Sequence, residues 1–180
     1  APRHLSIHPG GAGVLAGLGG KDATDFFDEL HKPEILESIG SEYKIGVIGD
    51  NRPRMYFSML AAESLGGISV AVYQDSIAAE LGFVLEHADV RFIIAENEEQ
   101  TDKLQELKDQ LGKVEKIIFD DSRGLETNTD DWLIDYETVQ RRGDEFAQSN
   151  AGYYEAEVEK GQGRDVSIYC YTSGTTGDPK

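Results

Sequence analysis

The sequence has few cysteines, few basic residues and no long apolar run. Its 180 residues include one cysteine, Cys170, which excludes an intramolecular disulfide and is typical of a reducing compartment. Lys and Arg number 17 against 34 Asp and Glu, and a surface with a net charge of −17 repels phosphate backbones. No apolar run approaches the ~20 residues of a membrane span, and no signal peptide is visible. We therefore expect a cytoplasmic protein with no transmembrane segment and no nucleic-acid partner.

The composition and length otherwise predict an ordinary globular chain. Hydrophobic residues make up 39% and charged residues 28% of the sequence. The length predicts one domain, or one and a fraction. Because the chain begins with Ala1 and ends on the last residue of a motif, we expect it to be part of a longer protein.

The most informative stretch is residues 171–180, which places hydroxyls, glycines and a lysine directly after an apolar strand. The glycines let the backbone approach a ligand closely. Backbone N–H groups and hydroxyls donate to phosphate oxygens, and a lysine supplies a cation. The glycine spacing excludes a Walker-type loop, and a flexible linker seldom follows an apolar strand. We predict a loop that holds nucleotide phosphates, with these residues: Thr172, Ser173, Gly174, Thr175, Thr176, Gly177 and Lys180.

This loop resembles the phosphate-loop signature of the adenylate-forming enzymes, a family of acyl-CoA synthetases, luciferases and peptide-synthetase adenylation domains. Other stretches within residues 44–180 resemble the long-chain acyl-CoA synthetases, among them residues 48–53, 73–76, 85–88 and 131–137. The resemblance implies a ligase that uses ATP, magnesium and CoA. A fatty carboxylate attacks the α-phosphate of ATP, pyrophosphate leaves, and the thiol of CoA displaces AMP from the acyl adenylate.

The same resemblance implies a catalytic role for Lys180, which would stabilise the departing pyrophosphate. The family places its adenine pocket, acyl tunnel and C-terminal catalytic lysine further along the chain. We therefore expect acid–thiol ligase activity of a parent protein, with fatty acid, ATP and CoA as small-molecule partners. These 180 residues alone are expected to be inactive, and peripheral membrane association of the parent stays open.

A second resemblance lies near the N-terminus. His8 precedes Pro9 and two glycines, residues 20–27 follow, and His31 ends the group. These residues resemble the haem-binding core of cytochrome b5-like domains. The resemblance implies that His8 and His31 are the two axial ligands of haem b iron, in a module for one-electron transfer. Glycines within residues 11–17 look like a dinucleotide fingerprint, but the strand and helix that this motif requires are not there.

From residue 43 onward the sequence alternates between strand and helix patterns. We predict strands at 44–48, 68–73, 91–95, 116–119 and 165–171, and helices at 54–65, 77–87, 98–111, 136–148 and 153–159. This order is typical of α/β proteins with a doubly wound parallel sheet, which bind ligands at the carboxyl ends of their strands. The predicted fold is a partial N-terminal domain of the adenylate-forming family over residues 44–180. A partial, mainly helical cytochrome b5-like segment over residues 1–43 precedes it.

Several side-chain predictions follow from these patterns. Ser76 is expected to cap the helix at 77–87, and His87 to lie at its C-terminus. Arg52 is interpreted as a surface charge at a helix start rather than a phosphate contact, and Cys170 as a core thiol. The acidic stretch 96–99 is expected to face solvent. The strand residues expected to be buried are Ile45, Val47, Val70, Val72, Ile93, Ile94, Ile117 and Ile168.

The junction between the two segments leaves two origins open. Either a haem-type module has replaced the opening part of a synthetase, or sequence from two genes has been joined, and we favour the second. Three functions remain: a fatty acid–CoA ligase fragment fused or joined to a haem-binding segment, a haem electron-transfer module, or an inert joined fragment.

Overall fold

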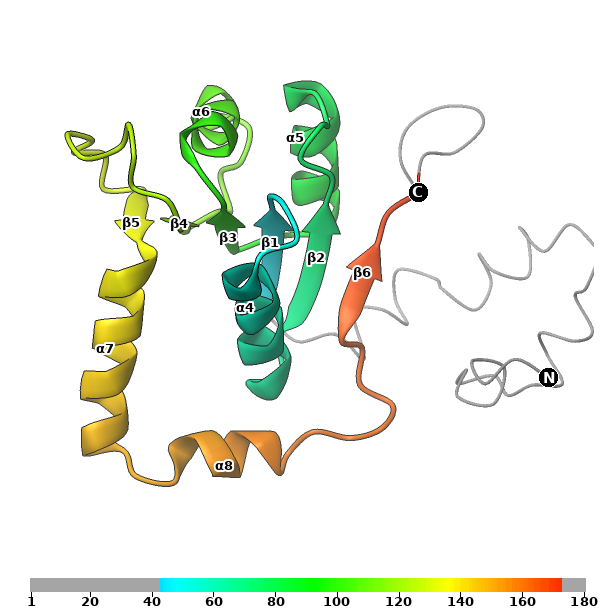
Figure 1. Cartoon of the computed structure of the whole chain (residues 1–180). Helices are drawn as coiled ribbons and strands as arrows, with labels where there is room; N and C mark the ends of the chain where they lie inside the picture. Colours follow the sequence, from blue (N-terminus) through cyan, green and yellow to red (C-terminus); the bar gives the residue numbers. More distant parts are fainter. Residues whose placement is uncertain (1–42, 173–180) are drawn as a thin grey trace, which may run out of the picture. The chain divides into compact units, whose positions relative to one another are not determined.

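The computed structural model describes residues 43–172, and those residues form an α/β unit around a parallel sheet (Figure 1). The sheet has six strands in the order β5-β4-β3-β1-β2-β6, and all five neighbouring pairs are parallel. The strands are β1 (Lys44–Ile48), β2 (Ile68–Val72), β3 (Phe92–Ala95), β4 (Lys116–Phe119), β5 (Leu133–Asp135) and β6 (Ile168–Cys170). The helices are α4 (Pro53–Ser64), α5 (Ala78–His87), α6 (Glu98–Glu106), α7 (Tyr136–Ser149) and α8 (Tyr153–Val158).

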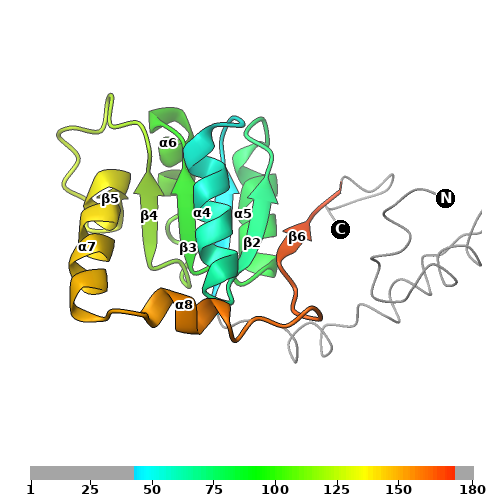
Figure 2. The same cartoon turned by 60° about the horizontal axis from the view of Figure 1, so that its bottom comes forward.

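Alternating strand residues supply two cores on opposite faces of the sheet. Ile93 belongs to the larger core, with residues of α5 and α6, whereas Ile94 packs with Met55 of α4 on the other face. Figure 2 agrees, with α4 and α7 in front of the sheet and α5 and α6 behind it. Covering both faces explains why these strands read as continuous apolar runs. The fold is therefore the doubly wound parallel arrangement that the sequence predicts.

The central strand β1 contains a glycine that lets α5 lie close to the sheet. A Cβ atom added to Gly46 would lie 2.8 Å from Cδ2 of Leu85, a residue that is only 1% exposed. β1 pairs with β2 on one side and β3 on the other. Gly46 thus allows a buried leucine of α5 to pack against the middle of the sheet.

The predicted elements agree with the structure within a few residues, with three differences. The helix that begins at Glu98 ends at Glu106, before residue 111, and β5 was not predicted. Ser76 does not cap α5: the N-cap position is Ile77, and no side chain caps the helix there. The tight turn that joins Ser76 N–H to the Tyr73 carbonyl places Ser76 before the cap position.

Strand β6 is more exposed than predicted. Ile168 is 37% exposed and Cys170 is exposed, so the predictions of a buried isoleucine and a core thiol are wrong. β6 is at the edge of the described sheet and pairs with β2. Tyr169 of β6 and Tyr171, which follows the strand, pack against the larger core, so Ile168 and Cys170 face the opposite side. The other predicted strand residues are buried, except that Ile45 and Val72 are half-buried.

None of the helices within residues 43–172 is long and apolar enough to cross a membrane.

Candidate functional site

The carboxyl ends of the parallel strands meet at one edge of the sheet, where α/β folds of this kind bind ligands. β6 ends at Cys170, and Tyr171 and Thr172 follow it to the end of the described residues. Of the predicted phosphate-loop residues, the structure therefore places Thr172, at this edge. The predicted residues outside the described part are Ser173, Gly174, Thr175, Thr176, Gly177 and Lys180, together with His8 and His31.

An ion pair with a buried carboxylate lies at the same edge, between β1 and β3. The chain passes from β1 to β2 on one side and then places β3 on the other side of β1, which creates a topological switch point. Glu96, which follows β3, is 3% exposed, and the prediction that it faces solvent is wrong. Its carboxylate accepts hydrogen bonds from the backbone N–H of Asp50 and pairs with Nε of Arg52 at 2.5 Å. Burial is tolerated because the charge is paired and hydrogen-bonded.

Arg52 has the helix-start position that the sequence predicts. It is the N-cap residue of α4, with Pro53 directly after it, and its side chain is 56% exposed. The pairing with Glu96 was missed, because 44 residues separate the two and no local pattern joins them. Its effect is to fix the loop after β1 to the end of β3.

Gly49 makes room for this ion pair. Its φ is +150°, and a Cβ atom there would lie 2.5 Å from Cβ of Glu96. Both facts exclude a side chain without a shift of the backbone.

Gly49→Ala is accordingly expected to lower the free energy of unfolding by about 1–3 kcal/mol, the usual cost of a strained backbone conformation. Equilibrium urea denaturation measures this change. Gly143→Ala is the matched control, since Gly143 lies exposed in α7 with no atom within 4 Å of its added Cβ. The control should be stabilised by roughly 0.5–1 kcal/mol through helix propensity. Equal stability of Gly49→Ala and the unsubstituted chain would contradict this account of Gly49.

Further hydrogen bonds tie the loops of this edge together. Gln74, after β2, donates from Nε2 to Oδ1 of Asp50 at 2.7 Å, and Lys103 of α6 donates to the Gln74 carbonyl at 2.9 Å. Arg54 of α4 donates to Asp120, after β4, at 2.7 Å, and this hydrogen bond is the main cause of the raised pKa of Arg54. The loops after four neighbouring strands are therefore fixed to one another or to a helix.

Several acidic residues of this edge are paired with basic side chains. Besides the pairs of Glu96 and Asp120, the carboxylate of Asp121 accepts hydrogen bonds from Arg123, which lowers the pKa of Asp121 to about 2. Local pairing of this kind reduces the repulsion that a net charge of −17 would otherwise exert on phosphate groups.

The end of β6 is linked to the last residue of α5. Nδ1 of His87 and the hydroxyl of Tyr171 lie 2.7 Å apart and share a hydrogen bond. The His87 ring also stacks on Phe83 with centroids 5.6 Å apart and meets the Tyr171 ring edge-on at 5.7 Å. Burial raises the pKa of Tyr171 to about 12, so its hydroxyl keeps its proton at neutral pH. The sequence predicted the position of His87 at the helix end but not this partner.

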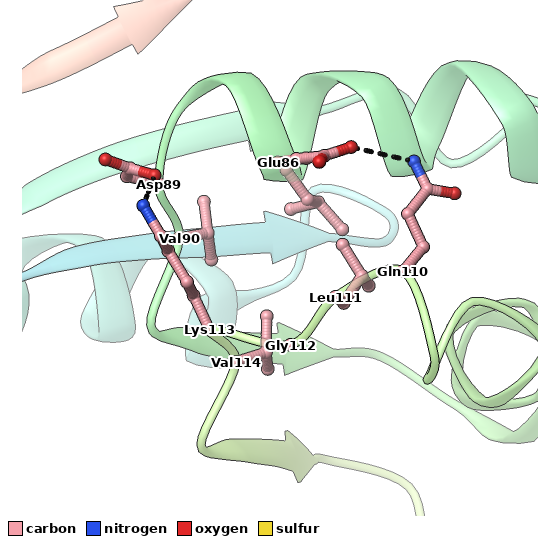
Figure 3. A pocket seen from close by; sticks show the side chains of 9 residues that line it. Glu86, Asp89, Val90, Gln110, Leu111, Gly112, Lys113 and Val114 are labelled. Atoms are coloured by element: carbon pink, nitrogen blue, oxygen red, sulfur yellow. Dashed lines mark hydrogen bonds and ion pairs between the residues drawn. The ribbon is translucent and has the colours of Figure 1, made fainter.

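A cavity of about 360 Å³ lies away from this edge, beside the turns that lead into β3 and β4 (Figure 3). Its floor is formed by Leu85, Val90, Leu111 and Val114. On its rim, Gln110 donates to Glu86 at 3.1 Å and Lys113 pairs with Asp89 at 2.5 Å. Because these polar groups satisfy one another and the cavity faces the amino ends of the strands, it does not fit the predicted phosphate site.

Comparison with known proteins assigns the family. Residues 35–180 match the family model described as AMP-binding enzyme. The chain belongs to the AMP-binding enzyme family. Long chain acyl-CoA synthetase 3 of Arabidopsis thaliana is 29% identical to this AMP-binding chain over 176 residues, which cover 93% of this chain and 26% of the relative. The human long-chain-fatty-acid–CoA ligase ACSBG2 is 24% identical over 136 residues, which cover 76% of this chain and 20% of the relative. The chain thus spans about a fifth to a quarter of these relatives.

The fold of a solved ligase is similar to that of this AMP-binding chain. The crystal structure of the anthranilate CoA ligase AuaEII in complex with anthranoyl-AMP superposes with a TM-score of 0.53 at 14% identity. The match covers 84% of this chain and 26% of the ligase. At this identity the likeness shows the fold alone, and it confirms the predicted α/β fold with a parallel sheet.

The second resemblance is confirmed as well. Residues 3–49 match the family model described as cytochrome b5-like haem/steroid binding domain. A Neurospora crassa protein described as a cytochrome b5 is 41% identical over 46 residues, which cover 26% of this chain and 55% of that protein. The two family matches overlap at residues 35–49, a range that includes β1. In the described residues β1 is a central strand of the α/β sheet. The predicted boundary between residues 43 and 44 stays a prediction.

Proposed function

We propose that this chain is part of an ATP-dependent long-chain fatty acid–CoA ligase that acts through an acyl adenylate. The main support is the AMP-binding family match over residues 35–180, which includes the whole predicted phosphate loop. The long-chain acyl-CoA synthetases and ligases among its relatives favour a fatty acid as the acyl substrate. The fold also supports the proposal, because β6 brings Thr172, the first residue of the predicted loop, to the carboxyl edge of the sheet.

In the proposed reaction a carboxylate oxygen of the fatty acid attacks the α-phosphorus of ATP. A new P–O bond forms, the bond to the β-phosphate breaks, and pyrophosphate leaves. The thiol of CoA then attacks the acyl carbon, loses its proton, and displaces AMP as the new C–S bond forms. The magnesium that accompanies ATP supplies charge neutralisation at the phosphates.

The roles of the loop residues follow from their chemistry. Hydroxyls and backbone N–H groups of residues 172–176 are proposed to donate to the β- and γ-phosphates, and Lys180 to balance the charge that builds up on pyrophosphate. The neighbouring loops after β1, β2 and β3 are joined by the Gln74–Asp50 hydrogen bond and the Arg52–Glu96 ion pair. A loop that leaves β6 therefore starts beside a fixed edge, and fixed donors need no reorganisation when charge develops.

The 180-residue chain provides a test of phosphate binding by itself. We expect Mg²⁺ with pyrophosphate or ATP to shift the backbone amide resonances of residues 172–180, whereas adenosine alone leaves them unchanged. The chain should form no AMP and no thioester, because it spans about a fifth to a quarter of its relatives. Equal shifts with adenosine, or none with pyrophosphate at millimolar concentration, would contradict the proposed role of the loop.

The cytochrome b5-like match supports a second candidate function, bis-histidine haem ligation. If His8 and His31 are the axial ligands, hemin titration should give the sharp Soret band and split visible bands of low-spin, six-coordinate iron. Binding should be weak, because the match covers 55% of the Neurospora protein. His31→Ala should abolish the spectrum, and His4→Ala should leave it unchanged.

Three outcomes of this titration are informative. A spectrum that survives His31→Ala would refute His31 as an axial ligand. The absence of a six-coordinate spectrum at every hemin concentration would refute the haem function, and the ligase function would remain as the proposal. Tight stoichiometric binding would show that the segment is complete enough to exclude water.

The genomic reading frame across residues 39–51 distinguishes a natural fusion from a joined sequence.

A further inference from the structure

Strand β6 is held to the α/β unit by few interactions. It has three residues, pairs with β2, and lies at the edge of the described sheet. Ile168 is 37% exposed and Cys170 is exposed, so one face of the strand contributes little burial. Short edge strands of this kind open at low free-energy cost. Yet the predicted phosphate loop begins directly after this strand.

A cluster of three rings adds a side-chain attachment at the end of β6, beyond the packing of Tyr169 against the larger core. His87 lies between Phe83 and Tyr171, with centroid distances of 5.6 Å and 5.7 Å, and its Nδ1 shares the 2.7 Å hydrogen bond with the Tyr171 hydroxyl. Helix α5, which carries Phe83 and His87, is fixed in the larger core by Leu81, Val84 and Leu85, at 0%, 5% and 1% exposure. Tyr171 is thereby joined to the most buried part of the unit, one residue before Thr172.

We propose that His87 and Tyr171 are positioning residues for the phosphate loop, which fix the end of β6 through their hydrogen bond and so set where Thr172 and the loop begin. This inference rests on the proposed function of the loop. Nδ1 accepts a hydrogen bond from the phenolic hydroxyl in the tautomer in which it carries no proton, and donates to the phenolic oxygen in the tautomer in which it does. The link therefore forms with either tautomer of the imidazole.

The test removes the hydrogen bond while keeping the rings. Tyr171→Phe deletes the hydroxyl, and His87→Phe deletes the nitrogen but keeps a ring between Phe83 and residue 171. Two quantities are measured on the 180-residue chain: amide hydrogen exchange of residues 168–172, and the affinity for Mg²⁺ with pyrophosphate. Each single variant should exchange about three- to tenfold faster in this segment and bind pyrophosphate about three- to tenfold more weakly, as expected for one lost hydrogen bond.

The double variant separates a shared bond from two independent effects. If the bond joins these residues, the double variant should be no worse than either single variant, because both remove the same interaction. Tyr154→Phe is the matched control, since it removes a tyrosine hydroxyl that bonds to Ser64 of α4 at 3.2 Å and not to His87. It should change neither quantity. A general loss of stability would instead accelerate exchange in the central strands too, which none of these variants should do.

Each result decides between the alternatives. If the effects of the two single variants add up in the double variant, or if amide exchange in the single variants is unchanged, the His87–Tyr171 hydrogen bond does not anchor β6. Faster exchange with unchanged pyrophosphate affinity would overturn its positioning role while the proposed function stands. Absence of pyrophosphate binding by the unsubstituted chain would overturn the proposed function and the positioning role with it.

Discussion

Ile93→Ala is expected to lower the free energy of unfolding by about 2–5 kcal/mol, the cost found for large-to-small changes in well-packed cores. Ile93 is fully buried in the middle of β3, opposite Gly46 of β1 and Ile117 of β4. Its side chain belongs to the larger core beneath α5 and α6, where close packing leaves little room for collapse around a cavity. Equilibrium urea denaturation followed by far-UV circular dichroism measures the change.

An exposed isoleucine provides the control for this experiment. Ile77 is 64% exposed, so Ile77→Ala should change the free energy of unfolding by no more than about 0.5 kcal/mol. Similar losses for the two variants would mean that Ile93 does not lie in a packed core, and the doubly wound arrangement would then be wrong.

The largest functional effect is expected for Lys180→Ala in a full-length protein that carries this sequence. The adenylation rate should fall by about 100- to 1000-fold, or 2.7–4 kcal/mol, by analogy with loss of one oxyanion donor. Fatty-acid affinity should change little, because the lysine is proposed to meet charge that develops on pyrophosphate. Gly174→Val should be at least as damaging, since a branched side chain blocks the approach of the backbone to phosphate. Pyrophosphate exchange measures this half-reaction.

Lys160→Ala is the control for the loss of a positive charge. Lys160 is a solvent-exposed lysine after α8 that pairs with Glu157 at 2.6 Å. Its replacement should leave exchange unchanged. If Lys180→Ala and Lys160→Ala show the same rate of pyrophosphate exchange, the proposed role of Lys180 is wrong, and residues 171–180 are an ordinary flexible loop.

The sheet was predictable because its strands are apolar on both faces. Ile93 and Ile94 face different cores, so both are apolar. A continuous apolar run between helical segments is typical of a strand in a parallel sheet covered on both faces, and the sequence therefore predicted this sheet. The exposure of Ile168 and Cys170 was not predictable in the same way. An edge strand and a central strand have the same apolar pattern, and only the strand order distinguishes them.

The candidate site was predictable where one local motif describes it. The order of hydroxyls, glycines and lysine in residues 171–180 indicated a phosphate loop, and the family match includes those residues. The surrounding contacts were not predictable, because they join distant residues. Glu96 lies in an acidic run that is typical of a solvated surface, and tertiary pairing with Arg52 buries it. His87 and Tyr171 are 84 residues apart and meet only in the folded protein.

The most direct test of the proposed ligase function is fatty-acid-dependent exchange of labelled pyrophosphate into ATP by the full-length protein. We expect exchange that requires both magnesium and a long-chain fatty acid and that occurs without CoA, because the acyl adenylate forms before the thiol reacts. Labelled ATP should appear at a rate that rises to saturation with fatty-acid concentration. Exchange that is absent with every fatty acid, or that proceeds equally well without one, would contradict the account.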